Sequence, residues 1–292
     1  MARTTPVALS IAGSDSGGGA GIQADLKAFA RCGVHGTCAI TAITAQNTVG
    51  VEAIQVVPPE IVLAQVRAVL HDIGVDAVKV GMLGTAPVTL AVAQALDELP
   101  DGTPVVVDPV MVAESGAQLL DDEARHALLA EILPRASVLT PNLPEARVLV
   151  GLGQARPAVA GPSGQGNGAA ATVEPPDEAD EAAALARALL AGGPRAVVIT
   201  GGHRSRAIDL FVSHDLEVVE IPGERHPDGA AHGSGCTHSS VLAAQLALGR
   251  SPLQAAKTAR AIAGEAVAHG LRDVGAGAGP VDAIGLAATR AG

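Results

Sequence analysis

The fold is decided near the start of the chain, where the sequence reads Val7-Ala8-Leu9-Ser10-Ile11-Ala12-Gly13-Ser14-Asp15-Ser16-Gly17-Gly18-Gly19-Ala20-Gly21-Ile22. Residues 7–11 are mostly apolar, which indicates a strand buried on both faces. A helical pattern then begins at Ile22 and continues to Arg31. The glycines between them predict a tight turn whose backbone can come close to a ligand. Open α/β sheets bind ligands at this position, beyond the carboxyl end of a strand.

The same alternation of a short apolar run and an Ala/Leu-rich helical stretch repeats along the chain. Further strands are expected at residues 37–44, 77–80, 104–107, 137–139 and 196–199. Helices are expected between them at about 60–71, 86–98, 121–132, 143–150 and 178–191. Strands that alternate with helices predict an α/β fold with a doubly wound, mostly parallel central sheet flanked by helices.

The last third of the chain has a different pattern. Residues 207–212 and 217–221 are separated by a short polar turn, which predicts a small β-hairpin at one edge of the sheet. Two helices are expected after it, at 233–248 and 251–269. The second of these begins with Ser-Pro-Leu-Gln, the pattern of an N-cap, a proline at the first helical position and a capping box.

One segment has too little apolar content to join a compact core. Residues 151–176 are rich in Gly, Ala, Ser and Pro, so we expect a flexible low-complexity insertion, either a plain surface linker or a mobile flap. Strand and helix patterns resume beyond it at the same rhythm. We therefore expect residues 1–292 to form a single domain.

Composition excludes several classes of protein. The chain has 292 residues, 19 Lys+Arg against 30 Asp+Glu, and a formal net charge of −11. Aromatic residues make up only 1%, and nucleic-acid binders need basic surfaces and stacking platforms. Three cysteines argue against a disulfide-stapled module, and no apolar run reaches the ~20 residues that span a bilayer. The first residues lack the pattern of a signal peptide, so a cytoplasmic location is expected.

Several predicted strands end in residues suited to a ligand. Gln46 follows the second strand and offers an amide to a heterocycle, whereas Gly81 and Met82 follow the third, where a glycine admits a ligand and a thioether can lie against a ring. The first loop lacks the Gly-Lys-Ser/Thr of a P-loop and the acidic partner of a dinucleotide fingerprint. Each motif alone is more often ordinary packing, but their shared position predicts a pocket.

Carboxylates occur at two other strand ends. Asp108 follows a buried strand, and Asn142 and Glu145 lie where the next strand stops and a helix starts. Asn142 and Glu145 suit a helix-capping pair. They equally suit a hard-cation site, in which oxygen ligands and waters hold Mg²⁺ beside phosphates. The sequence leaves both interpretations open.

The strongest signal is Ala230-Ala231-His232-Gly233-Ser234-Gly235-Cys236-Thr237, which opens a predicted helix. Successive backbone N–H groups at such a helix start form an anion-binding nest. Cys236 is expected to have a lowered thiol pKa at this helix end. A cysteine that only packs in the core and a cysteine hydrolase with His232 or His238 as base are the alternatives. A nest beside a glycine-rich loop suits phosphate better than an acyl group.

In this order the motifs resemble the hydroxymethylpyrimidine/phosphomethylpyrimidine kinases of thiamine biosynthesis, in the ribokinase-like superfamily. The resemblance extends over about residues 7–280 apart from the insertion. It implies ATP-dependent phosphorylation of 4-amino-5-hydroxymethyl-2-methylpyrimidine to its phosphate and then to the diphosphate, with Mg²⁺, by a homodimer. It also implies three groups of site residues: Gly13, Asp15, Gln46, Met82 and Val110 around the pyrimidine; Asp108, Thr200 and Gly202 at the nucleotide, with Asn142 and Glu145 at the metal; and Gly233, Ser234, Gly235 and Cys236 in the anion hole.

The chain departs from this family at several positions. Thr200 stands where many members have Lys, Ala231 replaces a usual Thr, and Arg260 replaces a common Lys. Cys236 stands where sugar-kinase relatives place an Asp base, and a thiolate there could assist the first step while the second, with an ionised phosphate as nucleophile, needs no base. Two alternatives stay open: a pyridoxal or pyridoxine kinase of the same fold, and a non-catalytic pyrimidine-binding relative.

Overall fold

The computed structural model describes residues 4–112, 116, 119–154, 178–203, 206–227 and 229–286. Its strands are β1 (Val7–Asp15), β2 (His35–Gln46), β3 (Val51–Val56), β4 (Ala77–Val80), β5 (Val105–Val107), β6 (Val138–Leu139), β7 (Ala196–Ile199), β8 (Ile208–Ser213) and β9 (Leu216–Pro222). Its helices are α1 (Gly21–Arg31), α2 (Pro59–Asp72), α3 (Ala86–Asp97), α4 (Asp122–Ala127), α5 (Leu143–Gln154), α6 (Glu178–Leu190), α7 (Ser234–Ala247) and α8 (Pro252–Ala268). A π-helical turn (Leu128–Ile132) continues α4, and 3₁₀ turns occupy Leu133–Arg135 and Gly201–His203.

All nine strands form one sheet, in the order β3-β2-β1-β4-β5-β6-β7-β8-β9. The six strands from β2 to β7 pair in parallel, whereas β3, β8 and β9 pair antiparallel at the two edges. The predicted doubly wound, mostly parallel sheet and its edge hairpin are therefore confirmed. The carboxyl ends of the parallel strands meet at one edge of the sheet, where the predicted motifs lie.

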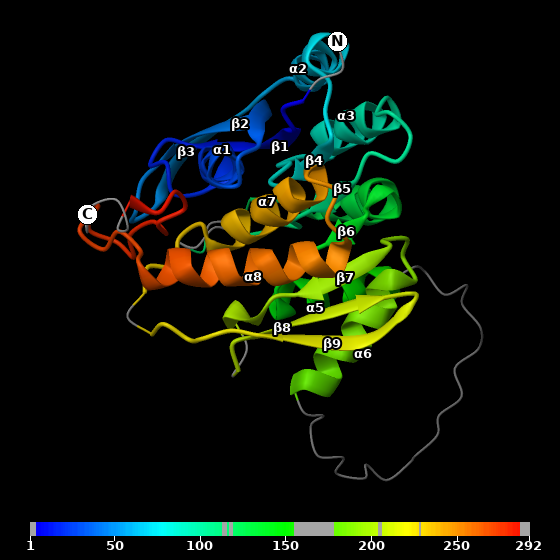
Figure 1. Ribbon diagram of the computed structural model, residues 1–292. Coiled ribbons are helices and arrows are strands. Elements are labelled where there is room, and N and C mark those ends of the chain that lie inside the picture. Colours follow the sequence, from blue (N-terminus) through cyan, green and yellow to red (C-terminus); the bar gives the residue numbers. More distant parts are fainter. Residues whose placement is uncertain are drawn as a thin grey trace, which may run out of the picture.

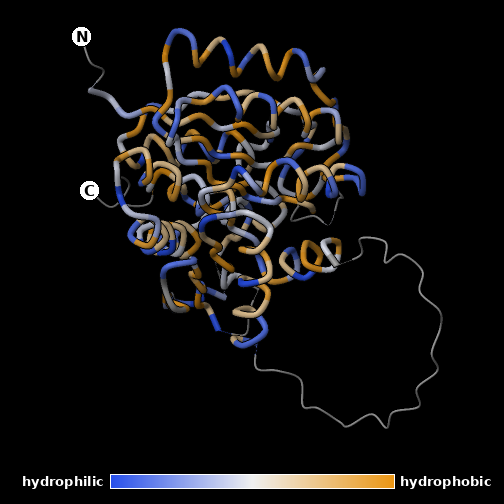
Figure 2. The backbone as a smooth tube through the Cα atoms, turned by 90° about the vertical axis from the view of Figure 1, so that its right-hand side faces the viewer, coloured by the Kyte–Doolittle hydropathy of each residue, from blue (hydrophilic) through white to orange (hydrophobic). Residues whose placement is uncertain are grey.

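Helices pack on both faces of the sheet (Figure 1). Buried side chains from α1, α7 and α8 form the core on one face, and those from α3, α5 and α6 form it on the other. Helix α2 buries Val62 and Val66, one turn apart, so it presents one apolar stripe to the sheet. Figure 2 shows this as alternating hydrophilic and hydrophobic turns along the uppermost helix. No helix of the described residues is long and apolar enough to cross a membrane.

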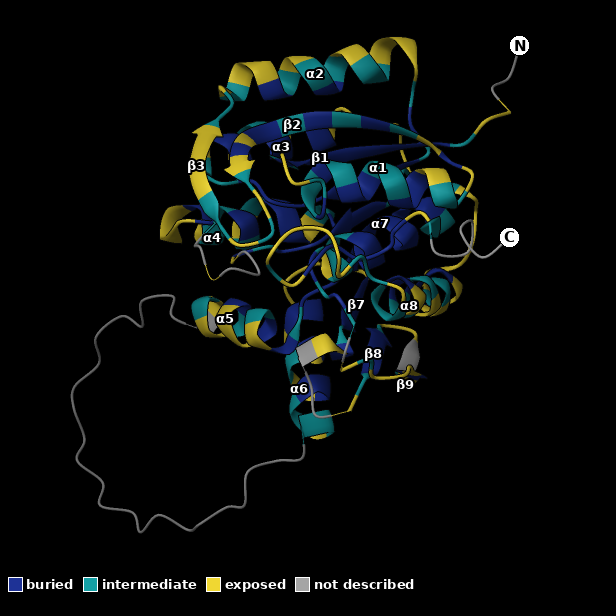
Figure 3. Ribbon diagram, turned by 90° about the vertical axis from the view of Figure 1, so that its left-hand side faces the viewer, coloured by how far each residue is buried: buried dark blue, intermediate teal, exposed yellow. Residues whose placement is uncertain are grey.

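Three local features differ from the expectations. Strand β3 was not expected, because its residues are mostly exposed and Glu52 and Gln55 interrupt the apolar pattern (Figure 3). Helix α5 continues to Gln154, so the first four residues of the expected insertion are helical. The rest of that segment, from residue 155, lies outside the described residues. The expected helix over 121–132 changes to π-helical hydrogen bonding at Leu128.

The start of α8 follows the sequence closely. The Ser251 hydroxyl accepts from the backbone N–H of Gln254, and the Gln254 side chain accepts from the backbone N–H of Ser251. This confirms the predicted capping box, with Pro252 at the first helical position. Helix α8 packs against α7 (Figure 1).

Candidate active site

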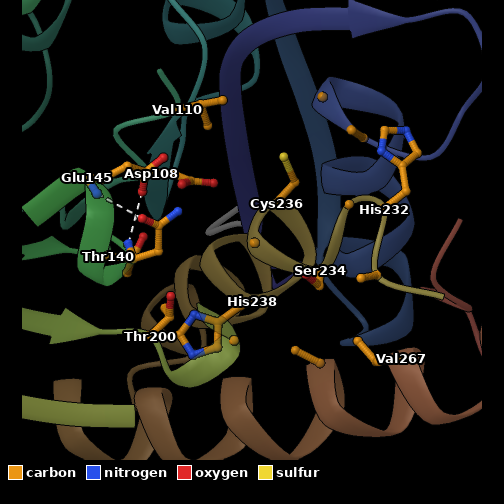
Figure 4. A pocket seen from close by; sticks show the side chains of 18 of the residues that line it. Asp108, Val110, Thr140, Glu145, Thr200, His232, Ser234, Cys236, His238 and Val267 are labelled. Carbon is orange, nitrogen blue, oxygen red and sulfur yellow. Dashed lines mark hydrogen bonds between the residues drawn. The ribbon is translucent and has the colours of Figure 1, made fainter. Parts of the chain in front are cut away.

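A cavity of about 680 Å³ lies at the carboxyl ends of the parallel strands. Every residue that the resemblance assigned to a site lines it: Gly13, Asp15, Gln46, Met82, Asp108, Val110, Asn142, Glu145, Thr200, Gly202, Gly233, Ser234, Gly235 and Cys236. Figure 4 shows Asp108 and Glu145 on one side of the cavity and Ser234 and Cys236 at the start of α7. The fold thus brings the predicted set together, and the contacts within it indicate what each residue can do.

Asp15 organises the glycine-rich loop. Its carboxylate accepts from the backbone N–H groups of Gly17 at 2.8 Å, Gly19 at 3.0 Å and Ala20 at 2.8 Å, and His232 Nε2 lies 3.1 Å from Oδ2. Burial raises the pKa of this carboxyl, but the bonds from His232, Ala20 and Gly17 outweigh burial and lower the pKa overall. Asp15 lies in the cavity wall as expected, with its charge directed to the loop.

The glycine-rich loop and the start of α7 touch through their backbones. Gly233 has a φ of 85°, in the left-handed region, and a Cβ on it would overlap the carbonyl oxygen of Gly19. A Cβ on Gly19 would in turn overlap the imidazole of His232. Both positions therefore require glycine, because close approach of two backbones places the nest against the loop.

The side of the cavity that Gly13, Gln46 and Met82 line has aliphatic and thioether walls. A Cβ on Gly13 would lie 2.9 Å from Met82 Sδ, so the missing side chain makes room for the thioether. The Thr44 hydroxyl contacts the Gln46 side-chain oxygen at 3.1 Å and the Ser14 carbonyl at 2.7 Å, which fixes the amide at the end of β2. An oriented amide beside Met82 suits a ring that carries hydrogen-bonding nitrogens.

Asn142 and Glu145 form the capping pair that the sequence allowed. The Glu145 carboxylate accepts from the Asn142 backbone N–H, and the Asn142 side-chain oxygen accepts from the Glu145 backbone N–H, both at 2.9 Å (Figure 4). Burial raises the pKa of Glu145 to about 8, and the charge of Asp108 adds to the increase. Burial likewise raises the pKa of Asp108, against the opposing effect of Lys79 and Ser239.

This donor set fits a magnesium ion that arrives with a nucleotide. No cluster of three His, Cys, Asp or Glu side chains that could hold a metal occurs among the described residues. Mg²⁺ usually takes one or two protein carboxylates and completes its shell with waters and phosphates. Burial and the charge of Asp108 favour the protonated form of Glu145, and a divalent cation between the two carboxyl groups and a phosphate would favour the ionised form of both.

The expected lowering of the Cys236 pKa is wrong. Burial raises the pKa of the thiol to about 12, and Asp108 and Asp25 add to the increase, whereas Lys79 and the backbone N–H of Gly21 oppose it. The cost of removing a thiolate from water exceeds the stabilisation that the helix terminus gives it, so the thiol is protonated at neutral pH. The two imidazoles that a cysteine hydrolase would need are paired elsewhere: His232 Nε2 with Asp15, and His238 Nε2 with Asp209 Oδ2 at 3.0 Å.

Sequence reasoning missed a buried lysine. Lys79 is fully buried in β4, with Nζ 3.0 and 3.2 Å from the two oxygens of Asp25 and 3.7 Å from Asp108 Oδ2. The available signal was a single charged residue inside an otherwise apolar strand, Ala-Val-Lys-Val. Gly81 was expected to admit a ligand, but a Cβ there would lie 2.8 Å from Lys79 Nζ. The glycine therefore makes room for the ammonium.

Sequence reasoning also missed a buried carboxylate, Asp209. Its Oδ1 accepts from the backbone N–H of Gly201 at 2.7 Å, which fixes the turn that follows β7. Arg260 lies close, with Nε 3.8 Å from Asp209 and Nη2 2.6 Å from the carbonyl oxygen of Ala207. Arg260 thus brings a positive charge to the same end of the cavity as Thr200, where the sequence lacks the lysine common in the family.

A doubly wound sheet whose strand ends combine a glycine loop, buried carboxylates and a helix-terminal anion nest defines an ATP-dependent kinase of the ribokinase-like class. The sequence profile of the phosphomethylpyrimidine kinase family matches residues 15–160 and 169–282, and the chain belongs to that family. A hydroxymethylpyrimidine/phosphomethylpyrimidine kinase of Rhizobium meliloti is 46% identical over 95% of this chain and 96% of its own. One from Streptomyces coelicolor is 42% identical over 96% and 94%.

Solved structures of two kinds share the fold. A phosphomethylpyrimidine kinase of Clostridium difficile has a TM-score of 0.70 and 35% identity, covering 88% of this chain and 97% of its own. A pyridoxal kinase of Staphylococcus aureus, in complex with pyridoxal, has a TM-score of 0.79 and 30% identity, covering 97% and 94%. Backbone similarity does not separate the two activities, whereas the sequence relatives favour the pyrimidine kinases.

Proposed function

We propose that this enzyme transfers a phosphoryl group from ATP to the hydroxymethyl group of 4-amino-5-hydroxymethyl-2-methylpyrimidine, and a second one to the resulting phosphate. The observation that carries the proposal is the single cavity in which an amide and thioether wall, two buried carboxylates and the nest at residues 233–236 face one another. The relatives named above carry both activities in their names.

The pyrimidine would lie against Gly13, Gln46, Met82 and Val110. The Gln46 amide would form hydrogen bonds with the amino group and a ring nitrogen of the pyrimidine, while Met82 and Val110 would supply apolar contact. Asp15 would keep the loop closed without touching the ring, since loop N–H groups and His232 occupy its carboxylate.

The transferred phosphoryl group would lie in the nest at the start of α7. The backbone N–H groups of Gly233, Gly235 and Cys236 lie at the positive end of the α7 dipole and would stabilise the charge that develops on the equatorial oxygens. The backbone N–H of Ser234 instead donates to the Ala231 carbonyl at 3.0 Å and shapes the turn before the helix. Cys236 would act there as a neutral thiol, because its pKa is about 12. A thiolate base in the first step does not fit that pKa.

The nucleotide would enter from the side of Thr200, Gly202 and Arg260. Asp108, with Asn142 and Glu145, would hold Mg²⁺, which supplies charge neutralisation of the phosphates when it is bound. Ala263, Gly264 and Val267 of α8 also line the cavity and would offer small or apolar surface to the base. Figure 4 shows Val267 on this helix.

Three further statements belong to the same proposal. The 292 residues act as a single kinase domain. The enzyme works in the cytoplasm, in keeping with three unpaired cysteines. It forms a homodimer through the β2–β3 edge, where Ile43 and Ile54 are 53% and 41% exposed on adjacent strands.

ATP consumption with separate substrates tests the function. We expect turnover with the hydroxymethylpyrimidine and with its monophosphate. Because few aromatic residues are available to select a ring, weaker turnover of pyridoxal is also expected. Turnover of pyridoxal alone would instead establish a pyridoxal kinase, and no turnover of any of the three would establish a non-catalytic relative.

A further inference from the structure

Lys79 raises a question that burial alone does not answer. An ammonium stays charged in a protein interior only when a nearby carboxylate matches its charge. Asp25 does this alone, with both oxygens within 3.2 Å of Nζ. Asp108, 3.7 Å away, is a second carboxylate beside the same ammonium. The charge of Lys79 is thus already balanced by Asp25, so charge balance does not explain why Asp108 also lies beside the ammonium.

The two carboxylates differ in how they are held. Asp25 accepts hydrogen bonds at 2.6 Å from the hydroxyls of Ser10 in β1 and Ser240 in α7, so neighbouring elements fix it independently of Lys79. Among the described residues, Asp108 accepts a hydrogen bond from one hydroxyl, that of Ser239 at 2.8 Å, and its other charged neighbour within 4 Å is Lys79. Asp108 therefore depends on the ammonium more than Asp25 does.

The contact between Lys79 and Asp108 is shielded from solvent. Nζ lies 3.7 Å from Asp108 Oδ2 and the lysine is fully buried, so water and salt screen this attraction little. The chain leaves space for the ammonium by placing a glycine at position 81.

We propose that Lys79 is a positioning residue of the phosphoryl-transfer site, whose buried ammonium holds the Asp108 carboxylate against α7 and toward the nucleotide. Lys79 itself is fully buried and works through Asp108. The proposal rests on the role given above to Asp108 beside Mg·ATP. Its consequence is that the loss of Lys79 weakens the use of Mg·ATP and leaves pyrimidine binding intact.

The test compares Lys79→Met with Asp25→Asn. Both substitutions break the Lys79–Asp25 ion pair, but only Lys79→Met removes the contact with Asp108. For Lys79→Met we expect kcat to fall by about a hundredfold and the Mg²⁺ requirement to rise about tenfold, as displacement of a positioned group does. The KM for the pyrimidine should change less than about twofold, because that wall is untouched. Asp25→Asn should keep kcat within about threefold of the wild type.

Gly81→Ala provides a variant that retains every charge. Its added Cβ would meet Lys79 Nζ at 2.8 Å and push the ammonium from its place. We expect the Mg²⁺ requirement to rise here too, by a smaller factor. Thermal unfolding and circular dichroism will show whether Lys79→Met folds. If it does not, the Mg²⁺ requirement of Gly81→Ala tests the role of Lys79 instead.

A double-mutant cycle with Asp108→Asn completes the test. If Lys79 acts through Asp108, adding Lys79→Met to Asp108→Asn lowers kcat by no more than about threefold. The inference is overturned if Lys79→Met and Asp25→Asn lose activity equally, if the two effects multiply, or if Gly81→Ala has a normal Mg²⁺ requirement. If Asp108→Asn itself is fully active, the role of Asp108 in the proposed function fails; if it is inactive while Lys79→Met is normal, only the inference about Lys79 fails.

Discussion

A carboxylate that accepts hydrogen bonds from several backbone N–H groups mainly stabilises the conformation of that backbone. Asp15 is 2% exposed, and three loop N–H groups and His232 surround its two oxygens. Each hydrogen bond to a charged group is worth about 1.5–3 kcal/mol, and an unmatched N–H left behind costs a similar amount. Asp15 therefore determines the shape of the glycine-rich loop.

We expect Asp15→Asn to lower the free energy of unfolding by about 2–4 kcal/mol, since an amide cannot accept all four bonds. The native pKa of Asp15 is lowered, so its contribution to stability is present above the ordinary value of 3.8 and is lost as the pH falls below it. Urea unfolding at several pH values measures this. The difference between variant and wild type should be constant near neutrality and shrink below that value; a difference that grows in acid would contradict the assignment.

Cys236 is expected to react slowly with alkylating agents. With a pKa of about 12, its thiolate is scarce at pH 8, and carboxymethylation should be at least about a hundredfold slower than that of free cysteine. Mass spectrometry of the peptide containing Cys236 measures the rate, and urea-unfolded protein serves as the control. Rapid, selective labelling of native Cys236 at pH 7 would show an activated thiolate instead.

Cys236→Ser tests the role of the thiol in transfer. A group that shapes the anion hole without accepting a proton contributes to both phosphorylations, so both rates should fall by a similar factor, about tenfold. The two steps are timed separately, with the hydroxymethylpyrimidine and with its monophosphate. A loss of rate confined to the first phosphorylation would instead indicate that Cys236 acts as a base there, which its high pKa argues against.

At the scale of elements, one backbone contact joins the start of α7 to the loop after β1. Gly233→Ala would force both a left-handed φ on alanine and an overlap with the Gly19 carbonyl. We expect kcat/KM to fall by at least about a hundredfold, because the nest moves away from its partners. Gly249→Ala is the matched control, since Gly249 follows the same helix at a φ of 76° with open space around it. Equal activities of the two variants would contradict this interpretation.

The elements that could be predicted are those whose signal is local. The central strands β5 and β7 are continuous apolar runs, and α8 carries its own capping box, so all three were predicted. Strand β3 is exposed on an edge, where pairing with β2 rather than burial creates it, and no local pattern marks that pairing. The sequence marks the strand-end residues that line the cavity, but Lys79 and Asp209 have partners distant in sequence and were missed. The Cys236 pKa was wrong because burial by the whole fold outweighs a local helix end.

At the scale of the whole molecule, the β2–β3 edge is expected to pair two copies. Ile54→Lys places a charge on the exposed face of β3 and should convert a dimer to a monomer, as light scattering after gel filtration would show. Leu90→Lys, at a side chain 52% exposed on α3, serves as a control that should stay dimeric. A wild-type monomer, or a dimeric Ile54→Lys variant, would place any interface elsewhere.

The net charge of −11 does not prevent the binding of a polyanion in this fold. Positive potential at the cavity comes from the start of α7 and from Arg260, both inside a surface that is acidic overall. Recognition of the phosphates is therefore local and stereochemical, and a long flexible polyanion such as RNA gains nothing from the rest of the surface.

The contact between Gly19 and Gly233 also has a consequence for the order in which the protein becomes competent. The two glycines come from opposite ends of the chain, so the contact closes a loop that contains most of the sheet. Such long-range closure costs the most chain entropy and is slow relative to local helix formation. A chain still emerging from the ribosome can assemble the amino-terminal strands, but it has no anion nest until α7 has been synthesised. If the nest holds the phosphates as proposed, a chain that lacks the carboxyl-terminal helices will not bind ATP, and nucleotide binding will report on the completed chain.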